Sequence, residues 1–248
     1  MTPDARDVVC SLDREHGNDG EHDSVIEVHE GTFPVVKATV LVVAALFPIV
    51  NPLGSAAIFT SMVGRTTAQV HDLLAQKISI YSFFLLICSL LWGVKVLSFF
   101  GISLYAVQIG GGIVVAATGW ALLNQSAPST KDEPVEDAHV LDHAFYPYTL
   151  PITVGPGSIS VAVTLGAHLP SELHESSLFS PRVLIASLLG IALICVIIYI
   201  CYRYARPAER RLGATGTSIV MRLSSFILLC IGIQIMSAGV KAYLATLH

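Results

Sequence analysis

The sequence predicts an all-α membrane protein with six transmembrane helices, arranged as two inverted repeats of three helices each. The first observation behind this prediction is composition: 53% of the 248 residues are hydrophobic and 13% are charged, against about 25% charged in a soluble domain. The second is that apolar runs of about 20 residues, the length that crosses a bilayer, recur along the chain. The third is a short Pro- and Gly-rich element that occurs once in each half.

Residues 1–32 precede the first apolar run and are polar and acidic. They hold half of the 18 acidic residues of the chain and show no apolar periodicity. Such a composition buries too little apolar surface to fold, so we expect a disordered tail. The segment lacks the basic start and apolar core of a secretory signal, so we expect no cleavage.

The first repeat is expected over residues 33–124. Its apolar runs predict spans at 33–63, 78–99 and 104–123. At about 1.5 Å per residue the first of these is longer than a straight crossing, which favours a broken or tilted helix. Thr67 precedes the second span and is predicted to be its N-cap.

A polar loop is expected over residues 125–143, and the second repeat over residues 144–248. The apolar runs of this half predict spans at 144–165, 183–202 and 219–244. Because each repeat has an odd number of crossings, the two halves insert into the membrane in opposite orientations.

The repeated element reads PIVNPLGS at residues 48–55 and PITVGPGS at residues 151–158. Proline removes a backbone N–H and clashes with the carbonyl four residues earlier, so a helix kinks or breaks there. In membrane helices Pro and Gly often do no more than bend the helix. Two such elements at corresponding places of two halves, however, point to a binding site near mid-membrane in a transporter. We therefore expect helices 1 and 4 to be broken.

The chemistry of such a site suits a small zwitterion. A half-helix that begins at a break presents unpaired N–H groups and a partial positive charge, which attract a carboxylate. Carbonyls freed by the break can accept hydrogen bonds from an ammonium group. An alternative is that the polar side chains only satisfy the carbonyls orphaned by the prolines. The candidate substrate-binding residues are Asn51, Pro52, Gly54, Ser55, Thr153, Gly155, Pro156, Gly157, Ser158, Gln108 and Gln234.

No Asp, Glu or His lies in the interior of a predicted span. An intramembrane carboxylate is the usual proton or cation relay, so a coupling ion would have to be held by backbone carbonyls and hydroxyls. This arrangement suits Na⁺ better than H⁺, and facilitated diffusion is equally consistent with it. We expect no metal site and no further cofactor.

The span interiors also lack a nucleophile paired with a base, so we expect that this protein is not an enzyme. Nothing in the charge distribution indicates nucleic-acid binding. The partners expected are the lipid bilayer and a small neutral solute such as glycine or alanine. Two alternatives remain open: an exporter of another solute class, and a membrane partner or regulatory protein that does not transport.

The run Gly110–Gly112 and Gly119 lie in the third span, where small residues let helix backbones approach closely. Close packing is therefore the preferred interpretation of these glycines. Arginines cluster between the fifth and sixth spans. Because positively charged short loops stay in the cytoplasm, we predict a cytoplasmic arginine cluster and extracytoplasmic termini. The cluster comprises Arg203, Arg206, Arg210 and Arg211.

Four stretches, in this order and spacing, resemble a known family. They are Asn51-Pro52-Leu53-Gly54 with Ile58-Phe59, Phe100-Gly101-Ile102-Ser103 before Ile109-Gly110-Gly111-Gly112, Pro151 with Gly155-Pro156-Gly157-Ser158, and Arg222-Leu223 followed by Gln234 and Gly239. From about Val36 to the C-terminus the chain resembles the MarC family of prokaryotic inner-membrane proteins, which is related to the SnatA neutral amino acid transporters.

The resemblance implies a multi-pass inner-membrane protein, and through SnatA it implies transport of glycine and other small neutral amino acids, an analogy at the level of the fold. Family members usually have Asp or Asn before the first Pro-Leu-Gly, and here the residue is Asn51. Many have a basic residue where this chain has Gln108, so any role of that charge is absent or moved.

Overall fold

The computed structural model describes residues 20–63, 66–124 and 137–247, and the regular structure of these residues is helical. Five of the described helices are long and apolar enough to cross a membrane, or six spans if the bent pair η2 and α6 counts as one. The class of all-α membrane protein is thus confirmed. The elements are α1 (Gly20–Val50), α2 (Pro52–Val63), α3 (Ala68–Phe99), α4 (Leu104–Asn124), α5 (Asp137–Asp142), the π-helix η2 (Ala144–Thr153), α6 (Pro156–Glu172), α7 (Pro181–Arg203) and α8 (Ala205–Ala245).

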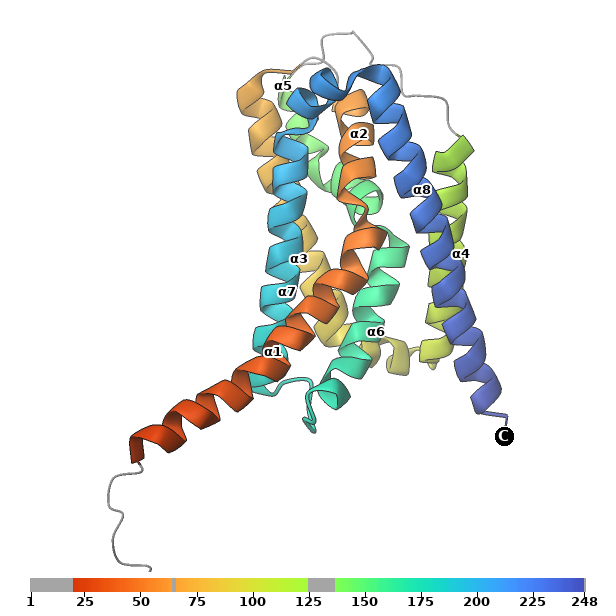
Figure 1. Cartoon of the computed structure of the whole chain (residues 1–248). Helices are drawn as coiled ribbons and strands as arrows, with labels where there is room; N and C mark the ends of the chain where they lie inside the picture. The colour runs from red at the N-terminus through yellow and green to blue at the C-terminus, as the bar shows by residue number, and fades with distance from the viewer. Residues whose placement is uncertain (1–19, 64–65, 125–136, 248) are drawn as a thin grey trace, which may run out of the picture.

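Helix α1 corrects the expected extent of the disordered tail. It begins at Gly20, so residues 20–32 are helical, and residues 1–19 lie outside the described residues. Extending an existing helix costs far less than nucleating one. In Figure 1 this first part of α1 projects away from the bundle.

Other boundaries also differ from the prediction, mostly because helices continue through polar residues that an apolar run does not reveal. Helix α8, for example, begins at Ala205 instead of residue 219. Helix α3 begins at Ala68 instead of Ile78, and the Thr67 cap is confirmed, since its hydroxyl accepts a hydrogen bond from the N–H of Val70 at 3.4 Å. Helix α6 continues past residue 165 to Glu172. The expected loop 125–143 contains the short helix α5, and its residues 125–136 are outside the described part of the chain.

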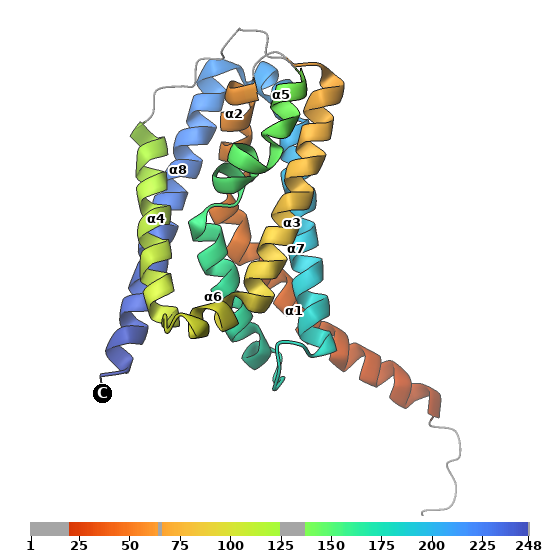
Figure 2. The same ribbon diagram turned by 180° about the vertical axis from the view of Figure 1, so that it is seen from behind.

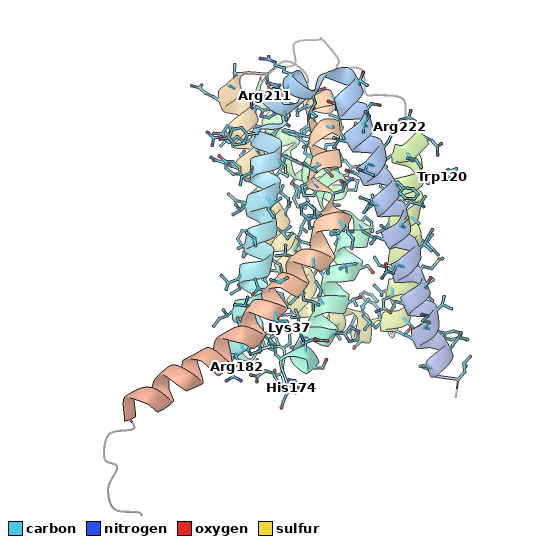
Figure 3. All side chains as sticks on the ribbon, viewed as in Figure 1. Lys37, Trp120, His174, Arg182, Arg211 and Arg222 are labelled. Atoms are coloured by element: carbon cyan, nitrogen blue, oxygen red, sulfur yellow. The ribbon has the colours of Figure 1, made fainter. Side chains whose placement is uncertain are left out.

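The helices form an elongated bundle (Figures 1 and 2). Helices α1, α3, α6 and α7 pack together, and α4 lies along α8 as a pair beside them. The start of α1 and the C-terminal end of α8 lie at the same end of the bundle. Lys37, His174 and Arg182 lie toward this end, and Arg211 and Arg222 lie toward the opposite one (Figure 3). We call that opposite end, which carries the arginine cluster, the arginine end.

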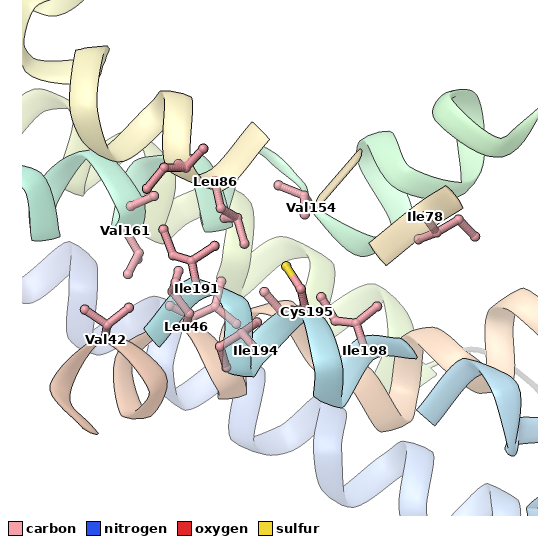
Figure 4. Packing of buried hydrophobic residues seen from close by; sticks show 14 of the residues in the cluster. Val42, Leu46, Ile78, Leu86, Val154, Val161, Ile191, Ile194, Cys195 and Ile198 are labelled. Atoms are coloured by element: carbon pink, nitrogen blue, oxygen red, sulfur yellow. The ribbon is translucent and has the colours of Figure 1, made fainter. Parts of the chain in front are cut away.

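A buried apolar cluster joins α1, α3, α6 and α7 (Figure 4). Val42 and Leu46 of α1 and Ile191 and Ile194 of α7 are fully buried, as is Leu86 of α3. Lipid is as apolar as these side chains, so their contribution comes from close packing. This cluster holds α1 and α6 against α3 and α7.

The pair α4–α8 is held by glycine contacts between backbones. A Cβ atom on Gly112 would lie 2.5 Å from the backbone nitrogen of Met236, and one on Gly119 would lie 2.5 Å from that of Leu229. The expectation of close packing is confirmed at these two glycines. Gly110 differs, because a Cβ there would meet nothing within 4 Å.

Candidate functional site

The first interruption is Asn51, which separates α1 from α2. Its φ of 46° lies in the left-handed region, which Asn tolerates better than most residues. Its side-chain Oδ1 accepts a hydrogen bond from the N–H of Gly54 at 3.2 Å, so Asn51 caps the start of α2. Pro52 takes the first helical position, where a missing N–H costs nothing. A Cβ on Gly54 would lie 2.9 Å from the Cγ of Asn51, so glycine makes room for this cap.

The second interruption is Val154–Gly155, across which η2 and α6 bend by 69°. Pro156 opens α6, and Gly155 supplies no side-chain cap. The N–H of Ile159 bonds to the carbonyl of Gly155 at 3.1 Å. The N–H groups of Gly157 and Ser158 come two residues and one residue earlier, respectively, where a helix has no internal acceptor for them.

A serine hydroxyl connects the two interruptions. Ser55 Oγ lies 3.0 Å from the carbonyl oxygen of Val50 and 3.3 Å from that of Ile152. Beside it, Thr153 Oγ1 donates to the carbonyl of Tyr148 at 2.7 Å and lies 2.7 Å from the hydroxyl of Tyr202. The interruptions are therefore in direct contact.

A cavity of about 360 Å³ lies where the interruptions meet, and residues from both of them line it. Seven of the predicted residues are among its walls: Asn51, Ser55, Thr153, Gly155, Pro156, Gly157 and Ser158. The other four do not line it. Pro52 and Gly54 are buried in the first turn of α2, Gln108 is buried in α4, and Gln234 is exposed on α8.

A further wall comes from residues of α4 and α8 that the sequence did not single out. Val114, Val115, Thr118 and Leu122 of α4 and Leu228 of α8 face the cavity. The spacing of residues 114, 118 and 122 marks one face of a helix, but which face turns toward the site depends on the glycine contacts with α8.

Gly157 packs directly against this wall. A Cβ atom on Gly157 would collide with Cγ2 of Val115. Glycine therefore lets the start of α6 approach α4, and it keeps the N–H groups of that first turn next to the cavity.

The described lining of this cavity contains no ionisable side chain. No group of three or more His, Cys, Asp or Glu that could hold a metal occurs among the described residues. The polar groups on offer are hydroxyls, carbonyls and the amide N–H groups of a helix start. Such groups can bind a small dipolar molecule, and they include no general base.

A family model described as "MarC family integral membrane protein" matches residues 36–244. The "UPF0056 inner membrane protein MarC" of Escherichia coli strain K12 is 30% identical over 220 residues, which cover 86% of this chain and 98% of that protein. The protein of the same description from Shigella flexneri matches equally well. No solved structure matches this chain. Given the family match over most of its length and its apolar helices, this chain is an integral inner-membrane protein of the MarC family.

Proposed function

We propose that this protein transports small neutral amino acids, such as glycine or alanine, or solutes of similar size, by alternating access. The observation that carries the proposal is the cavity bounded by both interruptions, whose described lining has no ionisable side chain. An uncharged site discriminates against charged solutes because an unpaired charge is costly to bury. A zwitterion brings both of its charges and can pair them with backbone dipoles.

The two helix starts differ, and the difference suggests how such a solute would bind. The start of α2 is already capped by the side chain of Asn51. The start of α6 has no side-chain cap, and Gly157 and Ser158 at that start line the cavity. We place the substrate carboxylate at α6, where the helix dipole favours an anion. The ammonium group would face the carbonyls near Val50 and Ile152.

The size of the cavity supports a small substrate. Pockets for drug-sized ligands span roughly 300–1,000 Å³, and this one, at about 360 Å³, is near the lower limit. Its α4 wall is mostly aliphatic, which suits a short apolar side chain.

The pattern of helix contacts supports an inverted repeat of residues 33–124 and 144–248. Helix α1 packs on α7, and the corresponding pair η2 and α3 also packs together. Helix α2 contacts α8, and the corresponding pair α6 and α4 is likewise in contact. Two further contacts, α3 with α7 and α4 with α8, each join equivalent helices of the two halves. Rocking of one half against the other around the cavity would alternate access.

We propose Na⁺ as the coupling ion if transport is coupled. The cavity offers hydroxyls and carbonyls, including Ser55 and Thr153, and no carboxylate is among its described walls. Oxygen ligands of this kind suit an alkali cation, whereas a proton relay uses a titratable group. An imposed Na⁺ gradient should then drive uptake into proteoliposomes, whereas an imposed pH gradient should not.

We propose that the arginine end faces the cytoplasm, which places both termini outside. The α7–α8 junction concentrates four arginines in one short segment, whereas the basic residues of the opposite end, Lys37, Lys95, Arg182 and Lys241, occur singly. Clustered positive charge marks the cytoplasmic side. Alkaline phosphatase fused after residue 248 should be active in cells. A green fluorescent protein at the same place that fluoresces instead would overturn this orientation.

Flux into proteoliposomes across a panel of labelled amino acids tests the proposed activity. Wild-type protein should exchange glycine or alanine with saturation, and Gly157→Leu should lose at least 90% of the flux because the new side chain meets Val115 and fills the cavity. Gly110→Leu is the matched control, since a Cβ at Gly110 meets nothing. Undiminished flux in Gly157→Leu, or no saturable flux of any neutral amino acid in wild type, would refute the proposal.

A further inference from the structure

A second cavity, of about 570 Å³, lies at the arginine end, away from the site between the interruptions. It forms where the start of α3 meets the junction of α7 and α8. Charged and polar side chains dominate its walls, in contrast to the first cavity: Gln69, His71, Asp72, Arg203, Arg206 and Arg210 are among them.

Two of the three arginines have structural partners. Arg203 forms an ion pair with Asp72 at 3.1 Å, and Tyr199 donates a hydrogen bond to the same carboxylate at 3.1 Å. Arg206 donates to the carbonyl and the hydroxyl of Thr66 at 2.8 and 2.9 Å. These bonds connect the α7–α8 junction to the start of α3. A structural role therefore explains the presence of Arg203 and Arg206 in this cavity.

Two other groups that line the cavity, the side chains of Arg210 and His71, have no such structural partners. Arg210 is exposed and forms no ion pair or hydrogen bond with any described residue. His71 is only 4% exposed, and its Nε2 has no hydrogen-bond partner within the described part of the chain. A buried polar atom without a hydrogen-bond partner destabilises the fold. Because His71 lines the cavity, a ligand bound there would supply the missing hydrogen-bond partner of its Nε2 atom.

The electrostatics of the cavity favour an anion. Three guanidinium groups face one carboxylate, that of Asp72, and the start of the 32-residue helix α3 adds partial positive charge. Burial and the neighbouring charge of Arg210 lower the pKa of Arg206, while Glu209 partly offsets them. Two arginines that repel each other beside a cavity are stabilised when an anion lies between them.

We propose that this cavity binds a phosphate-bearing anion. Guanidinium groups present planar pairs of donors that match phosphate oxygens, and helix starts offer further amide donors. Basic pockets between membrane helices on the cytoplasmic side suit phospholipid headgroups, and a free phosphate has the same chemistry. Arg210 would contact the anion directly, with Arg206 and the Nε2 of His71 completing the site.

Two binding measurements on purified full-length protein test this proposal. In neutral detergent, inorganic phosphate is titrated by calorimetry. In a separate arm, retention of phosphatidylglycerol is compared with that of phosphatidylcholine by native mass spectrometry. Arg210→Gln should weaken binding tenfold or more. Arg211→Gln should change it less than twofold, because Arg211 is an exposed neighbour that does not line the cavity.

His71→Phe provides a second variant, since it keeps an aromatic ring against Phe59, 5.1 Å away in the wild type, and removes the nitrogen. It should weaken binding without lowering the melting temperature. Binding of phosphate alone would assign the site to a soluble anion, and selective retention of phosphatidylglycerol would assign it to a lipid headgroup; either supports the site. Equal effects of Arg210→Gln and Arg211→Gln, or no binding in both arms, would overturn it.

Discussion

The hydroxyl of Ser55 lies 3.3 Å from the carbonyl oxygen of Ile152, 97 residues further along the chain. The same hydroxyl lies 3.0 Å from the carbonyl of Val50. One proton thus serves two carbonyls, one from each helix interruption, and both belong to residues that line the central cavity. This contact holds the two halves of the chain together where we propose that a solute binds.

Ser55→Ala should therefore destabilise the protein. The change leaves the carbonyls of Val50 and Ile152 without this donor, and a buried acceptor without a partner costs about 1–3 kcal/mol. For a chain of this length the melting temperature should fall by roughly 2–4 °C per kcal/mol. Ser158→Ala is the matched control, because the Ser158 hydroxyl is buried beside the same cavity and bonds to no described residue. Equal melting temperatures for the two variants in detergent would count against the contact.

Asn51 should be replaceable by glycine more readily than by alanine. A left-handed backbone costs an ordinary residue roughly 1–2 kcal/mol, and loss of the N-cap costs about 0.5–2 kcal/mol more. Glycine avoids the first cost and most of the second. Asn51→Ala should thus unfold at least 3 °C below Asn51→Gly in a thermal scan. The opposite order would show that the φ of 46° at this position is not adopted in the protein.

The glycine contacts between α4 and α8 give a prediction with an internal control. Gly112→Val should separate the two helices, because its side chain would lie against the backbone of Gly232 and Met236. Overpacking of this kind typically costs 1–3 kcal/mol. Gly110→Val, two residues away on the open face of the helix, should leave thermal stability within about 0.5 kcal/mol of wild type. A similar loss in both variants would contradict this packing.

The sequence sufficed for the class of the protein, its family and several local features. Composition and apolar run lengths predicted helices that cross a membrane, and the structure confirms this. The Thr67 cap and the close approach at Gly112 followed from residue type and spacing alone. The inverted repeat and the residues that bind a substrate stay predictions.

What the sequence could not supply were features set by packing between distant elements. The α4 wall at Val115 and Thr118 depends on how α4 rotates against α8. Gln234 was a candidate because it is polar within a span, yet it faces away from the bundle. The difference between the starts of α2 and α6 was also hidden, because only the structure shows that the side chain of Asn51 accepts a hydrogen bond from the N–H of Gly54.

Equilibrium binding of labelled alanine to purified protein tests the central claim most directly, in wild type, Gly157→Ala, Val115→Ala and the double variant. Because a Cβ on Gly157 collides with Cγ2 of Val115, Gly157→Ala should weaken binding at least tenfold. Val115→Ala removes the colliding methyl groups and should restore most of that loss in the double variant. Alanine binding that is the same in all four proteins, or absent from the wild type, would contradict a solute site between the two interruptions.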